Sequence, residues 1–289
     1  MYTTGAMNAP VRLLAFASLL AGVFALAAFA GDQADLGRGE PAAHEAAGGH
    51  GSGGSTHPDE RVDPVRGLAA SEDGLTLELS RTRAPADKRF ELGVRVVDAS
   101  GATVRGFDVE HTKRMHLIVV RRDLTGFQHL HPVQAADGSW SVPLTLDDPG
   151  SHRVFADFST GGEPRTLAGE VSVDGDVRSK PLPATTGSVE VDGLRVALAS
   201  GDAGAGEAAE LSFDVTRGGE PVAVERYLGA QGHLVALREG DLAFLHVHPD
   251  ADRLRFMAQF PSAGRYRLFL QFKTRGRVHT AAFTEQVTG

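Results

Sequence analysis

The stretch HLIVVRRDLTGFQHLHP (residues 116–132) returns later in the chain as HLVALREGDLAFLHVHP (residues 233–249). Each stretch opens with a histidine, and after twelve intervening residues it continues with His-x-His-Pro. The neighbouring segments repeat as well, since GSHRVFADF (150–158) matches GRYRLFLQF (264–272). Internal repetition on this scale indicates that one folding unit has been duplicated.

The repeated unit has the pattern of β-structure. Apolar and polar residues alternate in short segments such as LTLELS (75–80), FELGVRV (90–96) and WSVPLTL (140–146), and turn-forming residues separate these segments. A period of two over four to eight residues is typical of strands. Each copy has the size of an immunoglobulin-like sandwich, about 100 residues. The predicted fold is all-β, with two tandem immunoglobulin-like β-sandwich domains after an N-terminal apolar helix and a flexible linker.

Changes in composition set the predicted domain boundaries. Residues 1–30 are a signal peptide or a membrane anchor, and residues 31–66 form a flexible linker rich in Gly, Ala and His. Residues 67–176, here called the first repeat, form one β-sandwich. A linker at 177–187 leads to the second β-sandwich at 188–289, here called the second repeat.

The N-terminal segment predicts where the protein resides. Arg12 precedes an uncharged apolar run at residues 13–30, which is typical of an export signal. The run is also close to the ~20 residues that span a bilayer, so it is either a cleaved signal or an uncleaved anchor. Arg12 before the run and Asp32 after it predict that the bulk of the chain lies outside the cytoplasm. We expect a protein of the cell envelope that is membrane-anchored through this helix or secreted.

Composition excludes several classes of function. The formal net charge is −8 and no cluster of Lys and Arg stands out, which argues against nucleic acid as a partner. The absence of cysteine excludes disulfides, thiolate metal sites and a Cys nucleophile. No nucleophile elbow, phosphate loop or His-Glu-x-x-His motif is present, so we do not expect an enzyme. A copper-dependent oxidoreductase is the catalytic alternative, and no feature indicates a protein partner.

The repeated histidines are candidate ligands for copper or zinc. Two histidines that lie two residues apart on a strand point to one face, with Cα atoms ~6.5–7 Å apart, and can bind one ion. If Ile118 pairs with His129 across a hairpin, the first histidine of the motif joins the same face. Neutral imidazoles suit copper and zinc. The predicted metal ligands are His116, His129, His131, His233, His246 and His248.

A structural role for the same histidines is the alternative. Phe127 shares the face of the paired histidines, and such a residue usually faces a core. The ring nitrogens would then bond to backbone carbonyls or to a buried acid, for which Glu110, Asp123 and Asp157 are candidates. Duplication copies structure and function alike, so the repeat does not decide between a metal site and a structural cluster.

Two further groups of side chains could bind metal. His111, Met115 and His116 form a second candidate cluster in the first repeat, with Met115 as a soft ligand. The flexible linker contains three more histidines, which we interpret as part of a solvated tether, because flexible ligands lose conformational entropy on binding. These linker residues are His44, His50 and His57.

The segments KRMHLIVVRRDLTGFQHLHP (113–132) and GSHRVFADF resemble those of exported bacterial proteins, mostly actinobacterial, with duplicated MHL…FxHLHP segments. They are also similar to YtkA-like envelope β-sandwich domains. The resemblance implies an envelope location and a link to copper or other heavy metals. The second copy departs from the first at three pairs of positions: Met115 and Gly232, His111 and Leu228, and His152 and Tyr266. A role for the first member of each pair cannot be shared by both repeats.

Overall fold

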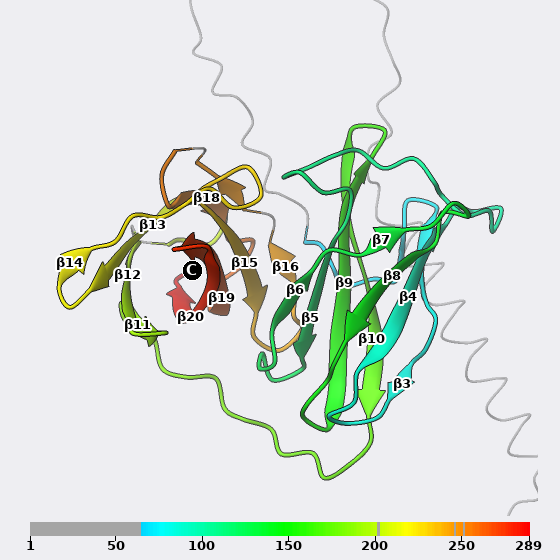
Figure 1. Cartoon of the computed structure of the whole chain (residues 1–289), viewed down its shortest axis with the longest axis horizontal. Helices are drawn as coiled ribbons and strands as arrows, with labels where there is room; N and C mark the ends of the chain where they lie inside the picture. Colours follow the sequence, from blue (N-terminus) through cyan, green and yellow to red (C-terminus); the bar gives the residue numbers. More distant parts are fainter. Residues whose placement is uncertain (1–64, 201–202, 246, 251) are drawn as a thin grey trace, which may run out of the picture. The chain divides into compact units, whose positions relative to one another are not determined.

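The computed structural model describes residues 65–289 except 201–202, 246 and 251. This part of the chain consists of β-strands and contains no helix, which confirms the predicted all-β class (Figure 1). Accordingly, no described segment is a helix with the length and hydropathy needed to cross a bilayer. The predicted signal or anchor at 1–30, and nearly all of the predicted flexible linker, lie outside the described residues.

The first repeat contains two sheets. One has the strand order β1-β2-β4-β8-β7 and the other has the order β3-β10-β9-β5-β6 (Figure 1). Neighbouring strands are antiparallel except for β3, which runs parallel to β10. The strands are β1 (Ser71–Glu72), β2 (Leu75–Leu79), β3 (Arg83–Ala84), β4 (Phe90–Val97), β5 (His116–Arg121), β6 (Gln128–Leu130), β7 (Val133–Gln134), β8 (Trp140–Leu144), β9 (Gly150–Thr160) and β10 (Glu163–Val173).

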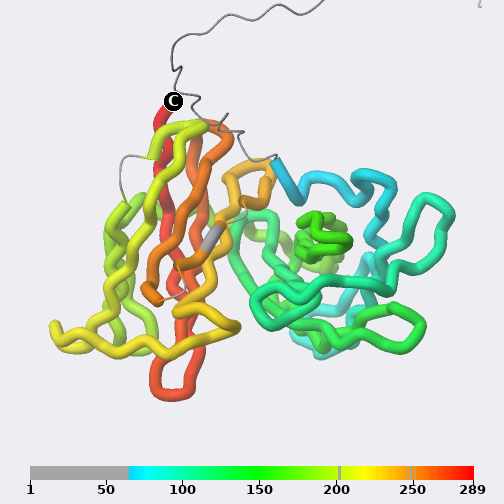
Figure 2. Tube along the Cα trace, turned by 90° about the horizontal axis from the view of Figure 1, so that it is seen from above, coloured from blue at the N-terminus to red at the C-terminus, as the bar shows by residue number. Residues whose placement is uncertain are grey.

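The described part of the second repeat has the same strand order, except that no strand corresponds to β3. One sheet runs β11-β12-β13-β18-β17, with β14 added beside β13, and the other runs β20-β19-β15-β16. The long β19–β20 hairpin, orange and red in Figure 2, corresponds to β9–β10. The strands are β11 (Ser188–Val191), β12 (Leu194–Ser200), β13 (Ala208–Arg217), β14 (Glu220–Pro221), β15 (Gly232–Arg238), β16 (Phe244–Leu245), β17 (His248–Pro249), β18 (Arg255–Gln259), β19 (Gly264–Thr274) and β20 (Arg277–Val287).

Each repeat encloses a hydrophobic core between its two sheets. In the first repeat, Leu92 of β4 and Leu117 of β5 belong to one buried cluster although they lie on different sheets. In the second repeat, Phe256 of β18 and Leu268 of β19 are joined in the same way. The alternating pattern seen in the sequence therefore turns one side of each strand toward a shared core.

Strand β5 is buried on both of its faces. Leu117 and Val119 face the core of the first repeat, whereas Ile118 and Val120 belong to a cluster built from both repeats. This division follows from the alternation of side chains along a strand. We call the second cluster the seam; its buried members are Ile118, Val120, Leu124, Phe155, Ala168, Val235, Leu237, Leu242, Phe244 and Phe269.

Contacts across the seam are reciprocal. Phe127 of the first repeat stacks on Phe269 of the second, with ring centroids 4.1 Å apart and planes inclined by 8°. Phe155 of the first repeat lies 5.4 Å from Phe244 of the second. In the matched sequences Phe127 corresponds to Phe244, and Phe155 corresponds to Phe269. The two repeats therefore present equivalent surfaces to each other, as the subunits of a twofold dimer do.

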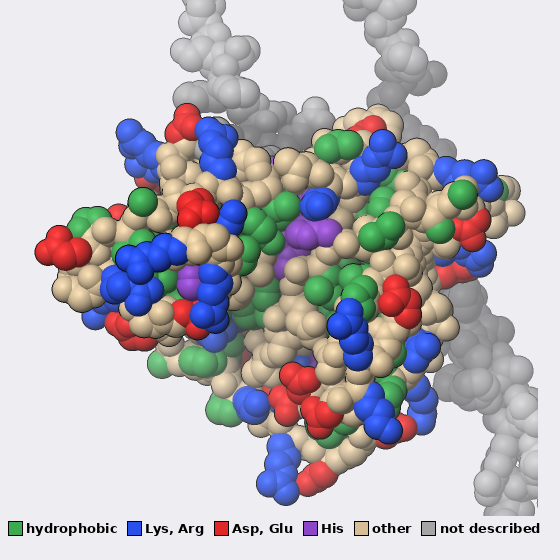
Figure 3. Space-filling model, viewed as in Figure 1, with side chains coloured by type: hydrophobic (Ala, Val, Ile, Leu, Met, Phe, Trp, Pro, Cys, Tyr) green, Lys and Arg blue, Asp and Glu red, His purple; other side chains and the backbone are tan. Residues whose placement is uncertain are grey.

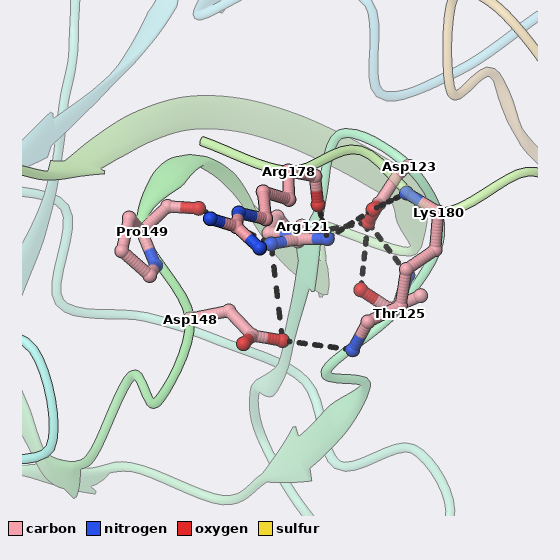
Figure 4. Close-up of polar contacts among 7 residues, drawn as sticks. All are labelled: Arg121, Asp123, Thr125, Asp148, Pro149, Arg178 and Lys180. Carbon is pink, nitrogen blue, oxygen red and sulfur yellow. Dashed lines mark hydrogen bonds and ion pairs between the residues drawn. The ribbon is translucent and has the colours of Figure 1, made fainter. Parts of the chain in front are cut away.

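The linker after the first repeat is held by a buried ion pair at the end of β5 (Figure 4). Arg121 binds Asp123, and it also donates to the backbone carbonyl of Arg178 at 2.9 Å. The backbone N–H of Lys180 donates to Asp123 at 2.8 Å. Burial opposes ionisation of Asp123, but the hydrogen bonds from Arg121 and Lys180 hold its pKa below the ordinary value. The start of the linker is thus fixed to the hairpin that carries the histidine motif.

Candidate metal centre

The first histidine motif lies on the β5–β6 hairpin. Ile118 pairs with His129 across this hairpin, which is the register that the sequence analysis named as the condition for a shared face. Because side chains alternate along a strand, His116 then shares the face of Ile118, and His131 shares the face of His129. This is the face that meets the second repeat rather than the face that packs into the first-repeat core.

The structure brings His116, His129 and His131 together. One ring nitrogen from each lies within 4.8 Å of the corresponding nitrogen of the other two. The ring centroids are separated by 4.8 Å between His129 and His131, and by about 5 Å for the other two pairs. His116 is buried and the other two are half-buried. Histidine side chains reach the surface on the face shown in Figure 3, where hydrophobic side chains border them.

Two of these rings are oriented by carbonyl oxygens. His116 donates from Nε2 to the backbone carbonyl of Glu110 at 3.2 Å. His129 donates from Nδ1 to Oε1 of Gln271, at 2.8 Å, while the Gln271 amide nitrogen donates to Thr280. A carbonyl oxygen can only accept, so each ring carries its proton on this outer nitrogen. Metal-ligating histidines are usually oriented by such a bond from the second nitrogen.

The inner nitrogens of the same rings face each other. His116 Nδ1 and His129 Nε2 are 2.9 Å apart. A neutral imidazole has one N–H, so when both rings are neutral and donate it outward, two lone pairs meet. A cation between them removes this repulsion. Two nitrogens bound at ~2.0–2.1 Å to one ion, at an angle of about 90–110°, lie about 2.9–3.4 Å apart, which matches the observed separation.

The histidines of this group favour the neutral form. Burial, followed by the neighbouring His116 and His131, lowers the pKa of His129 to about 3. Burial and the proximity of His116 lower the pKa of His131 to about 4. Burial also lowers the pKa of His116, although Asp157 opposes the shift. Neutral imidazole is the form that ligates a metal, so at neutral pH a metal ion is a better occupant than an extra proton.

A histidine of the second repeat joins the group. The ring centroid of His233 lies 5.9 Å from that of His129, 6.0 Å from that of His116 and 5.0 Å from that of His111. We call the five side chains the histidine cluster: His111, His116, His129, His131 and His233. Burial, followed by the nearby His129, lowers the pKa of His233 to about 3.

Of the other predicted ligands in the second repeat, His246 lies outside the described residues. The backbone of His248 belongs to β17, opposite Met257 of β18. The residues that flank these two positions, Leu245, Val247 and Pro249, line the same small cavity as His116, His129 and His233. An equivalent trio in the second repeat stays a prediction.

The prediction of a second cluster in the first repeat, formed by His111, Met115 and His116, is wrong for Met115. Met115 is 1% exposed and packs in the first-repeat core. It directly precedes His116 on the chain, so its side chain points to the opposite face. His111 does lie near the site, with its ring centroid 6.2 Å from that of His116.

The predicted acidic partners have different roles. Glu110 acts through its backbone carbonyl and Asp123 binds Arg121, so neither carboxylate holds a histidine ring. Asp157 lies opposite His116 in the register of β5 and β9, and it accepts from Thr166 at 2.7 Å. The sequence interpretation missed Gln271, which occupies in β19 the position that Asp157 has in β9.

Residues 69–175 and 189–289 each match a family described as a domain of unknown function (DUF8832). The chain belongs to this family. Each DUF8832 segment falls within one of the two repeats and contains one histidine motif. Among curated proteins, none matches the sequence.

Several solved structures are similar to the DUF8832 chain at low identity. The Escherichia coli adhesin FdeC is 14% identical with a TM-score of 0.26, over 76% of this chain and 66% of that chain. Yersinia pseudotuberculosis InvD is 13% identical with a TM-score of 0.27, over 75% and 58%. A Salmonella alpha-2-macroglobulin is 13% identical with a TM-score of 0.28, over 78% and 15%. The chain thus spans less than two thirds of each of these proteins, and similarity at these values supports no conclusion about its activity.

Proposed function

We propose that this chain is a metal-binding protein of the cell envelope that holds one copper(II) or zinc(II) ion at the histidine cluster. The ligands from the first repeat are His116, His129 and His131. The observation that carries the proposal is the convergence of one ring nitrogen from each of these three histidines within 4.8 Å, including the 2.9 Å approach of His116 Nδ1 and His129 Nε2. Three imidazoles without a thiolate suit these two metals.

The structural alternative requires a partner for each ring nitrogen. His131 Nε2 and His233 Nε2 are both buried, and neither has a hydrogen-bond partner among the described residues. Leaving such a group unpaired costs about 1–3 kcal/mol. Ligation of an ion removes this cost, whereas a purely structural cluster would carry it permanently. The unpaired nitrogens therefore favour the metal site.

The location rests on the N-terminal sequence. Arg12 before the apolar run at 13–30 supports export with the two tandem immunoglobulin-like domains outside the cytoplasm. We expect protease added to intact cells to degrade both repeats. Protection of the repeats until the cells are lysed would contradict this orientation.

Calorimetric titration of copper(II) and zinc(II) into the full chain tests the metal site. The protein should carry no histidine tag, and alanine should replace His44, His50 and His57 so that the tail does not compete for metal. We expect one ion per chain. His116→Gln retains a donor toward Glu110, and His129→Asn retains a donor toward Gln271, yet each removes the inner nitrogen. Each should weaken binding by at least about 100-fold.

His279→Gln is the matched control, since His279 is also buried but binds Asp192 and Thr274. Its affinity for the ion should equal that of the parent. Failure of the parent to bind either metal, or equal binding by the parent and the two cluster variants, would leave the structural role as the correct one.

A further inference from the structure

We infer that the metal site is shared between the repeats, with His233 of the second repeat as a fourth ligand, so that one ion joins both sandwiches. This inference rests on the proposed metal-binding function and adds which part of the chain completes the site. It differs from the sequence-based expectation of one separate trio in each repeat.

The position of His233 fits a common ion. It lies on β15, which corresponds to β5, at the position equivalent to His116. Its ring centroid is 6.0 Å from that of His116 and 5.9 Å from that of His129. The centroids of imidazoles bound to one ion at ~2.0–2.1 Å are separated by about 4.5–6.5 Å, depending on the angle at the metal. The nitrogens of His233 fall outside the group within 4.8 Å that His116, His129 and His131 form, so its ring must move toward the ion to become a ligand.

The two nitrogens of His233 have the arrangement expected of a ligand. One bonds to the backbone of Leu228, and because Nε2 has no partner, the bonded atom is Nδ1. Nε2 is buried and carries a free lone pair, and the residue as a whole is only 8% exposed. An imidazole with one nitrogen fixed to a carbonyl and the other unpaired and desolvated is ready to ligate.

His233 also lines a cavity together with His111, His116 and His129, whereas His131 is not part of its wall. The cavity measures about 40 Å³, and its wall includes His116, His129, His233 and Asp157. This volume accommodates an ion or one water molecule and excludes a larger organic ligand. Asp157 adds an acidic group beside the space where positive charge would reside. Both the size and the donors of the cavity suit a bare metal ion.

The second repeat contributes an orienting group as well. Gln271 accepts the hydrogen bond from His129, a ligand of the first repeat, and it lies opposite His233 in the register of β15 and β19. Separation of the repeats would remove His233 from the site and would also release the ring of His129. An ion bound here therefore binds only the docked arrangement and stabilises it by mass action.

The test compares the full chain with His233→Asn, which retains a donor toward Leu228 but removes Nε2. Copper(II) is added to both proteins, and pulsed electron paramagnetic resonance counts the bound imidazoles. We expect the variant to have one imidazole fewer and to bind copper(II) about 10–1000-fold more weakly. His279→Gln should match the parent in both measurements. If His233→Asn does not fold, His233→Gln serves instead.

The outcomes separate this inference from the proposed function. If the parent binds no copper(II), the metal-binding function fails and this inference fails with it. If the parent binds one ion, and the His233 variant shows the same affinity and the same number of imidazoles, the metal site stands and its sharing between repeats is overturned.

Discussion

The face of β5 that meets the second repeat begins with His116 and continues with Ile118 and Val120, and β15 follows the same order from His233. Two adjoining regions of one interface thus differ completely in chemistry. The seam is apolar, so it gains about 25 cal/mol for each Å² removed from water. The histidine cluster buries polar nitrogens, and each one left unpaired costs about 1–3 kcal/mol. The seam therefore stabilises the docked repeats, whereas the histidine cluster is costly unless an ion occupies it.

The largest effect should come from the seam. Phe155 is fully buried and contacts Phe244 of the other repeat, so Phe155→Ala should lower the free energy of unfolding by about 3–5 kcal/mol. Urea denaturation measures this loss through Trp140, the single tryptophan, which lies in the first-repeat core. A loss below about 1 kcal/mol would mean that the seam contributes little to stability.

Acidification should act on the histidine cluster and leave the seam unaffected. The pKa values of His129, His131 and His233 are about 3, 4 and 3 in the folded protein, against 6.5 in the unfolded chain. Below pH 6.5 the unfolded chain binds protons that the folded one does not, so metal-free stability falls as the pH drops toward 4. Burial raises the pKa of Asp157 and that of Glu285, and these two groups act in the opposite direction.

We expect the metal-free protein to lose about 4–6 kcal/mol of unfolding free energy between pH 7 and pH 5, because each of the three groups contributes about 1.4 kcal/mol per pH unit below pH 6.5 and Asp157 and Glu285 oppose part of the loss. Urea denaturation at a series of pH values measures the slope. His129→Asn should reduce the slope, because it removes one of the titrating groups. A profile that is flat over this range would contradict the burial of neutral imidazoles.

Much of the fold, and three of the five members of the histidine cluster, could be predicted from the sequence. Alternating segments predicted the strands, and the spacing between Ile118 and His129 allowed, without requiring, the register that brings the first trio together. The docking of the repeats was not predicted, because period-two alternation identifies one buried face and does not show what covers the other. The uninterrupted apolar runs at 117–120 and 234–237 indicate strands that are buried on both faces. They were the sequence feature from which the docking of the repeats could have been predicted.

Gln271 could not be recognised from the sequence, because a lone amide belongs to no motif. Its contribution to the affinity for the metal ion should be intermediate. Gln271→Leu keeps a similar volume but removes the acceptor for His129 Nδ1. The free ring can then adopt other orientations, so affinity for the ion should fall by about 10–100-fold. Calorimetric titration measures the change, and Gln271→Glu, which retains an acceptor, should restore binding. Unchanged affinity in Gln271→Leu would show that His129 does not need this orientation.

The smallest effect on metal binding should come from a buried histidine outside the histidine cluster. In His279 both ring nitrogens have partners, at 2.7 Å to Asp192 and 3.0 Å to Thr274. His279→Gln should therefore change the affinity for copper(II) by less than about twofold, as expected for a distant, independent site. A large loss would indicate that the ion does not bind where the unpaired nitrogens meet.

Asp157 and Gln271 occupy equivalent positions in the two repeats, each opposite the first histidine of its motif. In a symmetric homodimer of a single repeat, one residue type would have to serve both positions, and two acids or two amides would face the shared centre. A chain that contains both copies is free of this restriction. It can place an acid on the wall of the cavity and, at the equivalent position of the other repeat, a neutral acceptor that orients His129, and so adjust the charge around a single ion by one unit.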